Sequence, residues 1–332
     1  MSLVRVGLFC TLAAAVALTP GCHCELSHRN GTPGEMGNAR FAWDEGLFGC
    51  LFGCNADNGM AQRAEASLVV LNYDELPNFS VSTDNPAVAV FTHDSTTNSS
   101  YIHVASGTPG TARVTLADAA TGDVIDVVAV DVRAVDAIEL SSPDYVSTFT
   151  IMLGGEQTLW FDLLDDRGRE LEGYGGVDYS FSGGLSASEI DLVDVIDQIL
   201  IGLFVGDSNE FACVTALALG SGSIVLTAPS GAVLDLPVAI VDESAVARVS
   251  LSTTFDGNPV APDDVLTVDA AVFDASDEII HAPNAMWSIT PGVVTINVAG
   301  SSYASLQASA PGAATLTCTV GTASDTFDVT FE

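Results

Sequence analysis

Hydrophobic and polar residues alternate in short runs along most of the chain after residue 63, and three of these runs are nearly the same. Each begins with an aromatic residue and continues with Ser, an apolar residue, and Ser or Thr. Alternate side chains of a strand point to opposite faces, so the aromatic and apolar residues share the face that packs into a core. The runs begin 100 and 108 positions apart, about one β-sandwich domain; they are Phe79–Ser82, Tyr179–Ser182 and Trp287–Thr290.

Further landmarks follow in the same order in each copy. A Gly-led run begins at Gly110, Gly222 and Gly312, and a closing strand-like run follows each of them. Short apolar runs separated by Gly, Pro, Asp and Asn are typical of antiparallel β-sandwiches. Copies two and three also share an acidic turn after a long run, at Asp165–Gly168 and Asp274–Asp277. The repeats predict an all-β chain of tandem antiparallel β-sandwich domains.

The pattern resembles that of the bacterial Ig-like domains typified by invasin and intimin repeats. That resemblance implies spacers and adhesive modules, and it brings no catalytic residues with it. The expected divisions are a lipoprotein signal peptide at 1–21, a tether or Cys-containing leader at 22–63, and Ig-like domains at 64–133, 134–243 and 244–332. The opening strand of copy one is not clear, and residues 38–44 could supply it, which would join part of the leader to that domain.

Copy two is longer than the others, with an insertion near 184–210. The distance from the aromatic residue to the Gly-led run is 43 residues in copy two, against 31 and 25 in the other two copies. A dense apolar run at Ile199, Leu200, Leu203 and Phe204 makes this insertion a candidate partner-binding segment. The alternative is that the run packs over its own domain. Both interpretations predict ordered structure here.

The first 22 residues have the parts of an export signal. Arg5 gives a positive start, an apolar stretch follows, and the small residue Gly21 precedes Cys22. The apolar stretch is shorter than the roughly 20 residues that span a bilayer. The site resembles the lipobox of bacterial lipoproteins, although the Leu is one place early. The resemblance implies a lipidated Cys22, a membrane partner through the lipid anchor, and an exported protein of the cell envelope, on the outer membrane and periplasmic or surface-exposed.

The charge balance excludes one class of partner. The chain has a formal net charge of −34, with nine cationic side chains that are all Arg. A basic patch that neutralises phosphates cannot be built from these, so we expect no nucleic-acid binding. The acidity favours solubility. Ca²⁺ held between carboxylates is possible, but no calcium-loop pattern is present, and Asp and Gly in the acidic turns are explained by the turns themselves.

Seven cysteines and five histidines carry the remaining candidate chemistry. Cys50 and Cys54, each next to a Gly, are expected to form a disulfide in an oxidising compartment, or one of them pairs with Cys24. A metal site formed by these residues with His23 and His28 is a remote alternative. Cys213 and Cys318 lie in apolar runs and are expected in the core. His93, His103 and His281 are accompanied by no catalytic motif, and we expect no enzyme.

Three functions therefore compete at this point. The first is a non-enzymatic envelope lipoprotein that acts as a spacer or adhesive module. The second is a surface receptor for carbohydrate or protein that uses the copy-two insertion. The third is a metalloprotein centred on the Cys/His leader. The residues alone name no partner.

We predict that Cys50 is oxidised, most simply to Cys54. The ring closed by this bond is small, so it constrains the unfolded chain little and contributes less than the ~2–4 kcal/mol of a typical disulfide. Thiol labelling of the denatured, unreduced protein should leave Cys50 unmodified, and labelling after reduction should modify it. Modification of both Cys50 and Cys54 without reduction would contradict the prediction.

Overall fold

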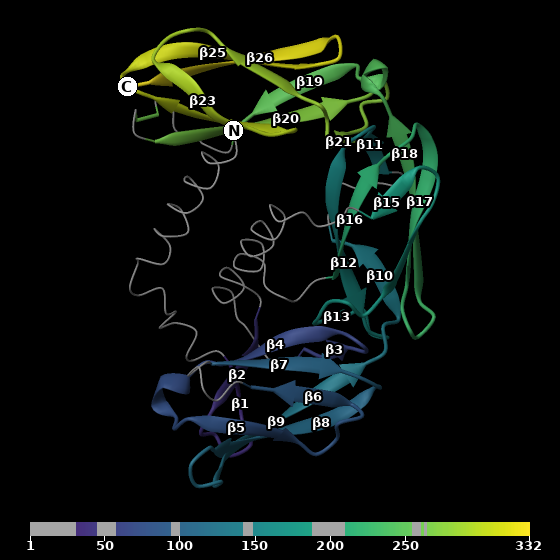
Figure 1. Cartoon of the computed structure of the whole chain (residues 1–332), viewed down its shortest axis with the longest axis vertical. Helices are drawn as coiled ribbons and strands as arrows, with labels where there is room; N and C mark the ends of the chain where they lie inside the picture. The colour runs from purple at the N-terminus through teal and green to yellow at the C-terminus, as the bar shows by residue number, and fades with distance from the viewer. Residues whose placement is uncertain are drawn as a thin grey trace. The chain divides into compact units, whose positions relative to one another are not determined.

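The computed structural model describes residues 31–44, 58–93, 100–141, 149–187, 210–253, 260–261 and 264–332. Within these ranges the regular structure is β-strand with short 3₁₀ turns at Tyr73–Glu75 and Glu243–Ala245. The strands pair mainly antiparallel in six sheets (Figure 1). The chain divides into two compact units, the first made of residues 1–136, 163–177 and 192–210, and the second of 137–162, 178–191 and 211–332. The expected all-β antiparallel fold is confirmed.

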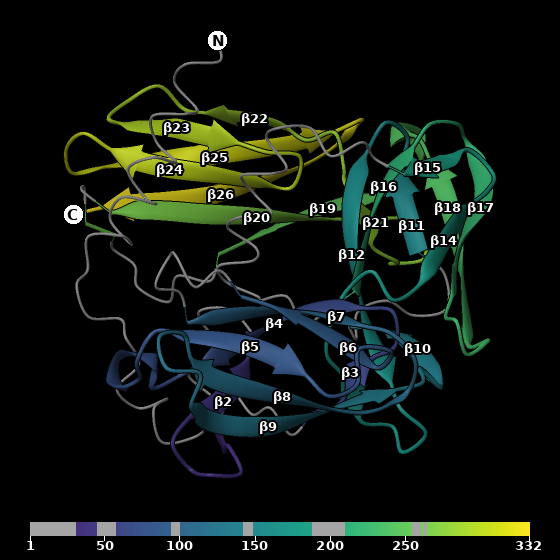
Figure 2. The same ribbon diagram turned by 60° about the horizontal axis from the view of Figure 1, so that its bottom comes forward.

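The first sandwich packs two sheets face to face. One sheet has the order β1-β2-β4-β7-β6 and the other β3-β9-β8-β5, and Figure 2 shows the two layers, with β4 and β7 in one and β8 and β9 in the other. Segment 38–44 contains β2, which pairs with β4, so it does supply the opening strand. The strands are β1 Thr32–Pro33, β2 Arg40–Trp43, β3 Met60–Ala61, β4 Glu65–Val70, β5 Phe79–Thr83, β6 Ala89–Thr92, β7 Tyr101–Ser106, β8 Gly110–Asp118 and β9 Val124–Arg133.

The second set of strands repeats this order. One sheet runs β10-β12-β16-β15, with β13 paired to β12. The other runs β14-β17-β18-β11-β21, in which β21 (Ile280–His281) comes from the loop after β20. Its strands are β10 Ala137–Leu140, β11 Phe149–Met152, β12 Glu156–Leu164, β13 Glu170–Leu171, β14 Asp178–Phe181, β15 Leu185–Ala187, β16 Glu210–Ala216, β17 Gly220–Thr227 and β18 Val233–Val241.

The third set has the sheets β19-β20-β24-β23 and β22-β25-β26, and Val260 forms an isolated parallel bridge to Phe331 of β26. The aromatic runs of the repeat are strands β5, β14 and β22, each paired with the Gly-led strand of its own sandwich. The strands are β19 Arg248–Ser252, β20 Val265–Phe273, β21 Ile280–His281, β22 Met286–Ile289, β23 Val294–Ala299, β24 Tyr303–Ala308, β25 Gly312–Val320 and β26 Ala323–Phe331.

Alternation along the strands fills each core. In β25, for example, Ala314, Leu316, Cys318 and Val320 are buried while the residues between them are half-buried. The largest fully buried side chains include Trp43 and Phe41 in β2, Phe161 in β12 and Phe331 in β26. Because burial of a large apolar side chain stabilises a fold by about 1.5–3 kcal/mol, these positions hold the two sheets of each sandwich together.

A buried carboxylate fixes the place where the described chain enters the first sandwich. The side chain of Asp126 on β9 is inaccessible and accepts hydrogen bonds from the N–H groups of Met36, Asn38 and Ala39, at 2.7–2.9 Å. A side chain at Gly34 would overlap this carboxylate, since an added Cβ would lie 2.3 Å from its atoms. The turn from 34 to 39 is therefore held by one buried acceptor rather than by apolar packing.

Candidate functional site

The acidic turn that follows β12 is stabilised by its first residue. The carboxylate of Asp165 accepts hydrogen bonds from the N–H groups of Arg167 and Arg169. The turn needs a positive φ at Gly168, which is +69° and is a conformation that Gly adopts without steric cost. The hydrogen bonds support the interpretation that Asp and Gly form the turn here.

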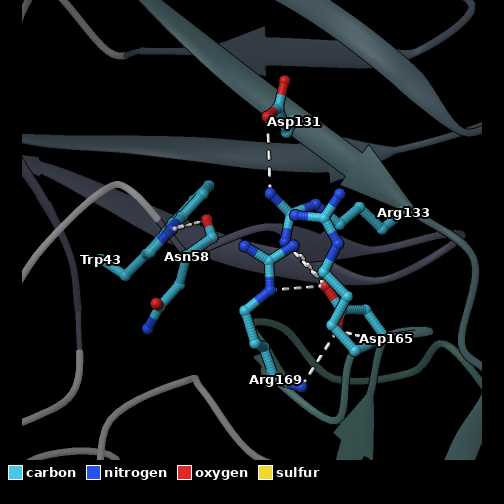
Figure 3. Close-up of polar contacts among 7 residues, drawn as sticks. Trp43, Asn58, Asp131, Arg133, Asp165 and Arg169 are labelled. Carbon is cyan, nitrogen blue, oxygen red and sulfur yellow. Dashed lines mark hydrogen bonds and ion pairs between the residues drawn. The ribbon is translucent and has the colours of Figure 1, made fainter.

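Two arginines converge on the same carboxylate from different parts of unit 1. Oδ2 of Asp165 accepts from Nη1 of Arg133 at 2.9 Å and from Nη2 of Arg169 at 2.7 Å (Figure 3). The Asp165 side chain is 2% exposed, whereas that of Arg133 is 24% exposed and that of Arg169 is 48% exposed. Oδ2 of Asp131 lies 3.6 Å from Nη2 of Arg133. We call Arg133, Asp165 and Arg169 the arginine cluster.

The arginine cluster keeps Asp165 ionised. Burial by itself would raise the pKa of this carboxyl group, but hydrogen bonds from Arg169 and Arg167 and the charge of Arg169 hold its pKa far below the usual range. A buried carboxylate is tolerated only when it is paired and hydrogen-bonded. Loss of Asp165 would remove the carboxylate on which both arginines converge, so Asp165 ties the turn to the end of β9.

Beyond the turn, the loop pairs through its backbone with the short strand β3. The N–H of Ala61 donates to the carbonyl of Glu172, and the N–H of Glu172 donates to the carbonyl of Gly59, both at 2.9 Å. Met60 and Glu172 form a parallel bridge, while the other side of β3 pairs in parallel with β9. The loop therefore adds one more strand to the edge of the β9 sheet.

Side chains and a glycine support this pairing. Nε1 of Trp43 donates to the carbonyl of Asn58, whose side-chain nitrogen donates to Glu172 at 2.8 Å (Figure 3 labels Trp43 and Asn58). Gly173 has a φ of +105°, and an added Cβ would lie 2.9 Å from the Cβ of Ala64. Gly173 is thus required both by its backbone conformation and by the close approach of the loop.

The same arrangement occurs in unit 2 with different chemistry. There β11 pairs in parallel with β18 on one side and with β21 on the other. His281 opposes Ile151 seven residues after Asp274, just as Glu172 opposes Met60 seven residues after Asp165. Asp274 also caps its own turn by accepting from Ser276 and Glu278. We call each such contact, a short parallel strand covered by the loop after the long strand, a joint.

The second joint is apolar where the first is ionic. The residue opposite Ala61 in the closing strand is Arg133, and the residue opposite Met152 is Val241. Met152 is buried in a cluster with Val246, Val272 and Ile280, and Val241 packs against that cluster. The positions of the glycine and the alanine are also reversed. In the first joint the glycine is in the covering loop, where Gly173 faces Ala64. In the second joint the alanine is in the covering loop, where Ala282 faces Gly155. One geometry is therefore stabilised by two kinds of contact.

The structure does not describe the residues that the sequence predicted to be functional. Cys22, Cys50, Cys54, Ile199, Leu200, Leu203 and Phe204 all lie outside the described residues, as do Cys24, His23 and His28. The sequence did single out the acidic turns, but it did not show that Arg133 would meet Asp165. A signal was present, since Arg133, Arg167 and Arg169 are three of only nine cationic residues and lie next to a turn that needs a counter-charge.

The described cysteines and histidines occupy structural positions. Cys318 is buried as expected, and burial, together with the charge of Asp325, raises the pKa of its thiol to about 11. Cys213 is only half-buried on β16, 3.5 Å from the hydroxyl of Thr158. The ring of His93 stacks on Phe79 and that of His281 stacks on Phe149. Within the described ranges, no three His, Cys, Asp or Glu side chains are grouped to hold a metal ion.

No helix of sufficient length and apolar character to cross a bilayer occurs in the part of the chain that the structure describes.

No protein-family model and no curated protein matches this chain. Among solved structures it is similar to domains 4–9 of surface layer protein SbsC, at 20% identity and a TM-score of 0.31, over 76% of this chain and 39% of that one. It is similar to the adhesin FdeC of Escherichia coli at 13% identity and a TM-score of 0.24. That match covers 91% of this chain and 99% of the FdeC chain. It is also similar to invasin, described as a bacterial integrin-binding protein, at 16% identity and a TM-score of 0.25. That match covers 83% of this chain and 58% of the invasin chain. The chain thus spans less than half of the SbsC fragment.

We predict that Asp165→Asn weakens the first joint. The substitution removes the charge that neutralises Arg133 and Arg169, so the denaturant concentration at the midpoint of unfolding of unit 1 should fall at neutral pH. Asp166→Asn, which changes the exposed neighbour, is the matched control and should leave that midpoint unchanged.

The loss of stability caused by Asp165→Asn should depend on pH. Because the folded-state pKa of Asp165 is depressed, its contribution is present above the unfolded-state pKa of about 3.9 and is lost as pH falls toward the folded-state pKa. The difference between the wild-type protein and Asp165→Asn should therefore shrink below about pH 4. An equal difference at pH 7 and at strongly acidic pH would show that Asp165 does not act through its charge.

Proposed function

We propose that this chain is an exported cell-envelope lipoprotein, anchored through Cys22, in which tandem Ig-like sandwiches act as a non-enzymatic spacer or adhesive module. The observation that carries the proposal is the joint. The same backbone pairing, in the same register and with the same seven-residue spacing, is built once on β3 and once on β11.

The joints suit a spacer because each adds hydrogen-bonded backbone at the end of a sandwich. Short linkers without such contacts leave neighbouring domains free to move. Here each joint adds main-chain hydrogen bonds to a sheet edge, with Ala61 and Met152 completely buried in the contact.

The pattern of the N-terminal residues supports a location in the cell envelope. The charged, apolar and small-residue segments before Cys22 have the order of a signal peptide. A single lipid chain gives only weak and reversible membrane binding, so stable anchoring needs more than one chain. The resemblance of residues 18–22 to a lipobox supports a lipidated Cys22, and the net charge of −34 favours solubility of the rest of the chain.

A receptor for a protein or glycan remains the second candidate, and one feature of the structure favours it. β15 and β16 pair as an antiparallel hairpin, with Ala187 opposite Val214. Residues 188–209 connect these two strands, whereas only residues 300–302 connect β23 and β24 in the third sandwich. The candidate contact residues Ile199, Leu200, Leu203 and Phe204 are therefore carried between two fixed strands, as variable binding loops are.

We predict that Cys22→Ser abolishes lipid attachment and that Cys24→Ser does not. Cells expressing each form would be labelled with a radioactive fatty acid, and the envelope and soluble fractions would be separated. The wild-type protein and Cys24→Ser should carry label and stay with the envelope, while Cys22→Ser should be unlabelled and released. Label on Cys22→Ser, or an unlabelled wild-type protein, would overturn the anchoring proposal.

A further inference from the structure

Asn58 and Gly59 lead into the short strand of the first joint, and hydrogen bonds hold both residues in place. The carbonyl of Asn58 accepts from Nε1 of Trp43 at 3.1 Å, and the side-chain nitrogen of Asn58 donates to Oε1 of Glu172 at 2.8 Å. The carbonyl of Gly59 accepts from the N–H of Glu172 at 2.9 Å. Glu172 therefore contacts Asn58 through its carboxylate and Gly59 through its backbone.

An Asn followed by Gly is the pair in which the Asn side chain cyclises most readily, because Gly has no Cβ to hinder attack by its nitrogen. The nitrogen of Gly59 would bond to Cγ of Asn58, and the side-chain nitrogen would leave as ammonia with the proton of the attacking N–H. Water then opens the resulting succinimide. Cleavage of the bond at Cγ gives aspartate, and cleavage at the former main-chain carbonyl carbon gives isoaspartate, whose main chain runs through Cβ. Water is the only co-reactant, and Asn58 is exposed to it.

The arginine cluster requires a glycine after Asn58. A Cβ added to Gly59 would lie 2.8 Å from Cδ and from Nε of Arg133. The guanidinium group of Arg133 is in turn held by Asp165 at 2.9 Å. A larger residue at position 59 would displace Arg133 from Asp165, so the packing of the first joint itself places the least hindered nucleophile beside Asn58.

The second joint carries different side chains at the same place. Phe149 stands where Asn58 stands, two residues before the bridged residue of the short strand, and Thr150 follows it. His281, which corresponds to Glu172, stacks its ring on that of Phe149 with the centroids 4.6 Å apart. At this position the first joint has a side-chain amide bonded to a carboxylate, and the second has two stacked rings that cannot undergo this reaction.

We propose that Asn58–Gly59 is a site of deamidation that acts as a one-way switch on the first joint. The closed joint protects Asn58. Cyclisation removes the nitrogen that donates to Glu172 and turns the main chain at Gly59, so the hydrogen bonds to Trp43 and Glu172 must break first. Opening of the joint exposes the pair to the reaction.

The product prevents the joint from closing again. Deamidation replaces the donating nitrogen of Asn58 by a carboxylate oxygen, at the place that lay 2.8 Å from Oε1 of Glu172. Glu172 is only 4% exposed, and like charges in a buried contact repel one another strongly. In the isoaspartate product the main chain is also longer, which shifts the carbonyl of Gly59 away from the N–H of Glu172. A transient opening thus becomes permanent. This inference goes beyond the proposed function and does not depend on export or on lipid at Cys22.

The first test compares the purified full chain in its folded state with the same chain in concentrated urea, both at mildly alkaline pH. Chromatography and mass spectrometry of its peptides measure the conversion of Asn58 to aspartate and isoaspartate. We expect conversion to be at least about tenfold slower in the folded protein, because the joint must open before the reaction. Asp165→Asn should raise the rate in the folded protein, while the matched control Asp166→Asn should leave it unchanged.

The second test introduces the aspartate product directly as Asn58→Asp. Hydrogen exchange at the N–H of Ala61, which donates to Glu172, should be at least about tenfold faster than in the wild-type protein, because a hydrogen bond to a charged group is lost. Exchange at Met152 in the second joint should not change. Asn58→Gln, whose longer side chain cyclises much more slowly, should remain unconverted in urea over the same period.

Any of three results would overturn the proposal. The first is an equal rate of conversion of Asn58 in the folded protein and in urea. The second is a rate in the folded protein that Asp165→Asn does not raise. The third is unchanged exchange at Ala61 in Asn58→Asp. None of them bears on the labelling experiment with Cys22→Ser, so the anchoring proposal and this one fail separately.

Discussion

Unpaired main-chain groups at the edge of a sheet are the constraint on which the joints depend. Each closing strand carries a short parallel strand at its edge, and the outer N–H and C=O groups of that short strand have no partner inside their own sandwich. Buried main-chain groups are almost always hydrogen-bonded, because an unpaired one costs as much as a lost hydrogen bond. Covering β3 or β11 with apolar surface alone would therefore be unfavourable. The loop that reaches Gly59 and Ala61 supplies both the cover and the hydrogen bonds.

With the backbone geometry fixed by this requirement, the side chains around it are free to differ. The first joint places a buried carboxylate between two arginines, and the second places Met152 and Ile280 in an apolar cluster. A buried ion pair is not in general more stable than an apolar contact of the same size, but removal of one partner is costly. The ionic joint is thus the more sensitive to substitution and to acid, while the backbone pairing is common to both.

How far the sequence could predict this structure depends on the range of the interactions. The aromatic-Ser alternation identifies β5, β14 and β22, because a strand's burial pattern is local. The joints could not be predicted in the same way. Asp165 and Arg133 are separated by 32 positions, and nothing in either segment specifies that the turn after β12 lies beside the end of β9. The contacts of Gly173 with Ala64 and of Gly155 with Ala282 are likewise not evident in the sequence, because they form only when the loop packs on the short strand. The sequence-based sites at Cys22 and Ile199 depend on segments outside the described residues.

The central claim is that the same edge position is covered by a hydrogen-bonded loop in two copies, once with ionic and once with apolar side chains around it. Native-state hydrogen exchange of individual amides measures this most directly, because exchange is slow where an N–H is buried and bonded and fast where it is exposed. The account predicts slow exchange at both Ala61 and Met152 in the wild-type protein, and faster exchange at Ala61 but not at Met152 in the Asp165→Asn protein. Rapid exchange at Ala61 and Met152 in the wild-type protein, or equal acceleration of both by Asp165→Asn, would contradict it.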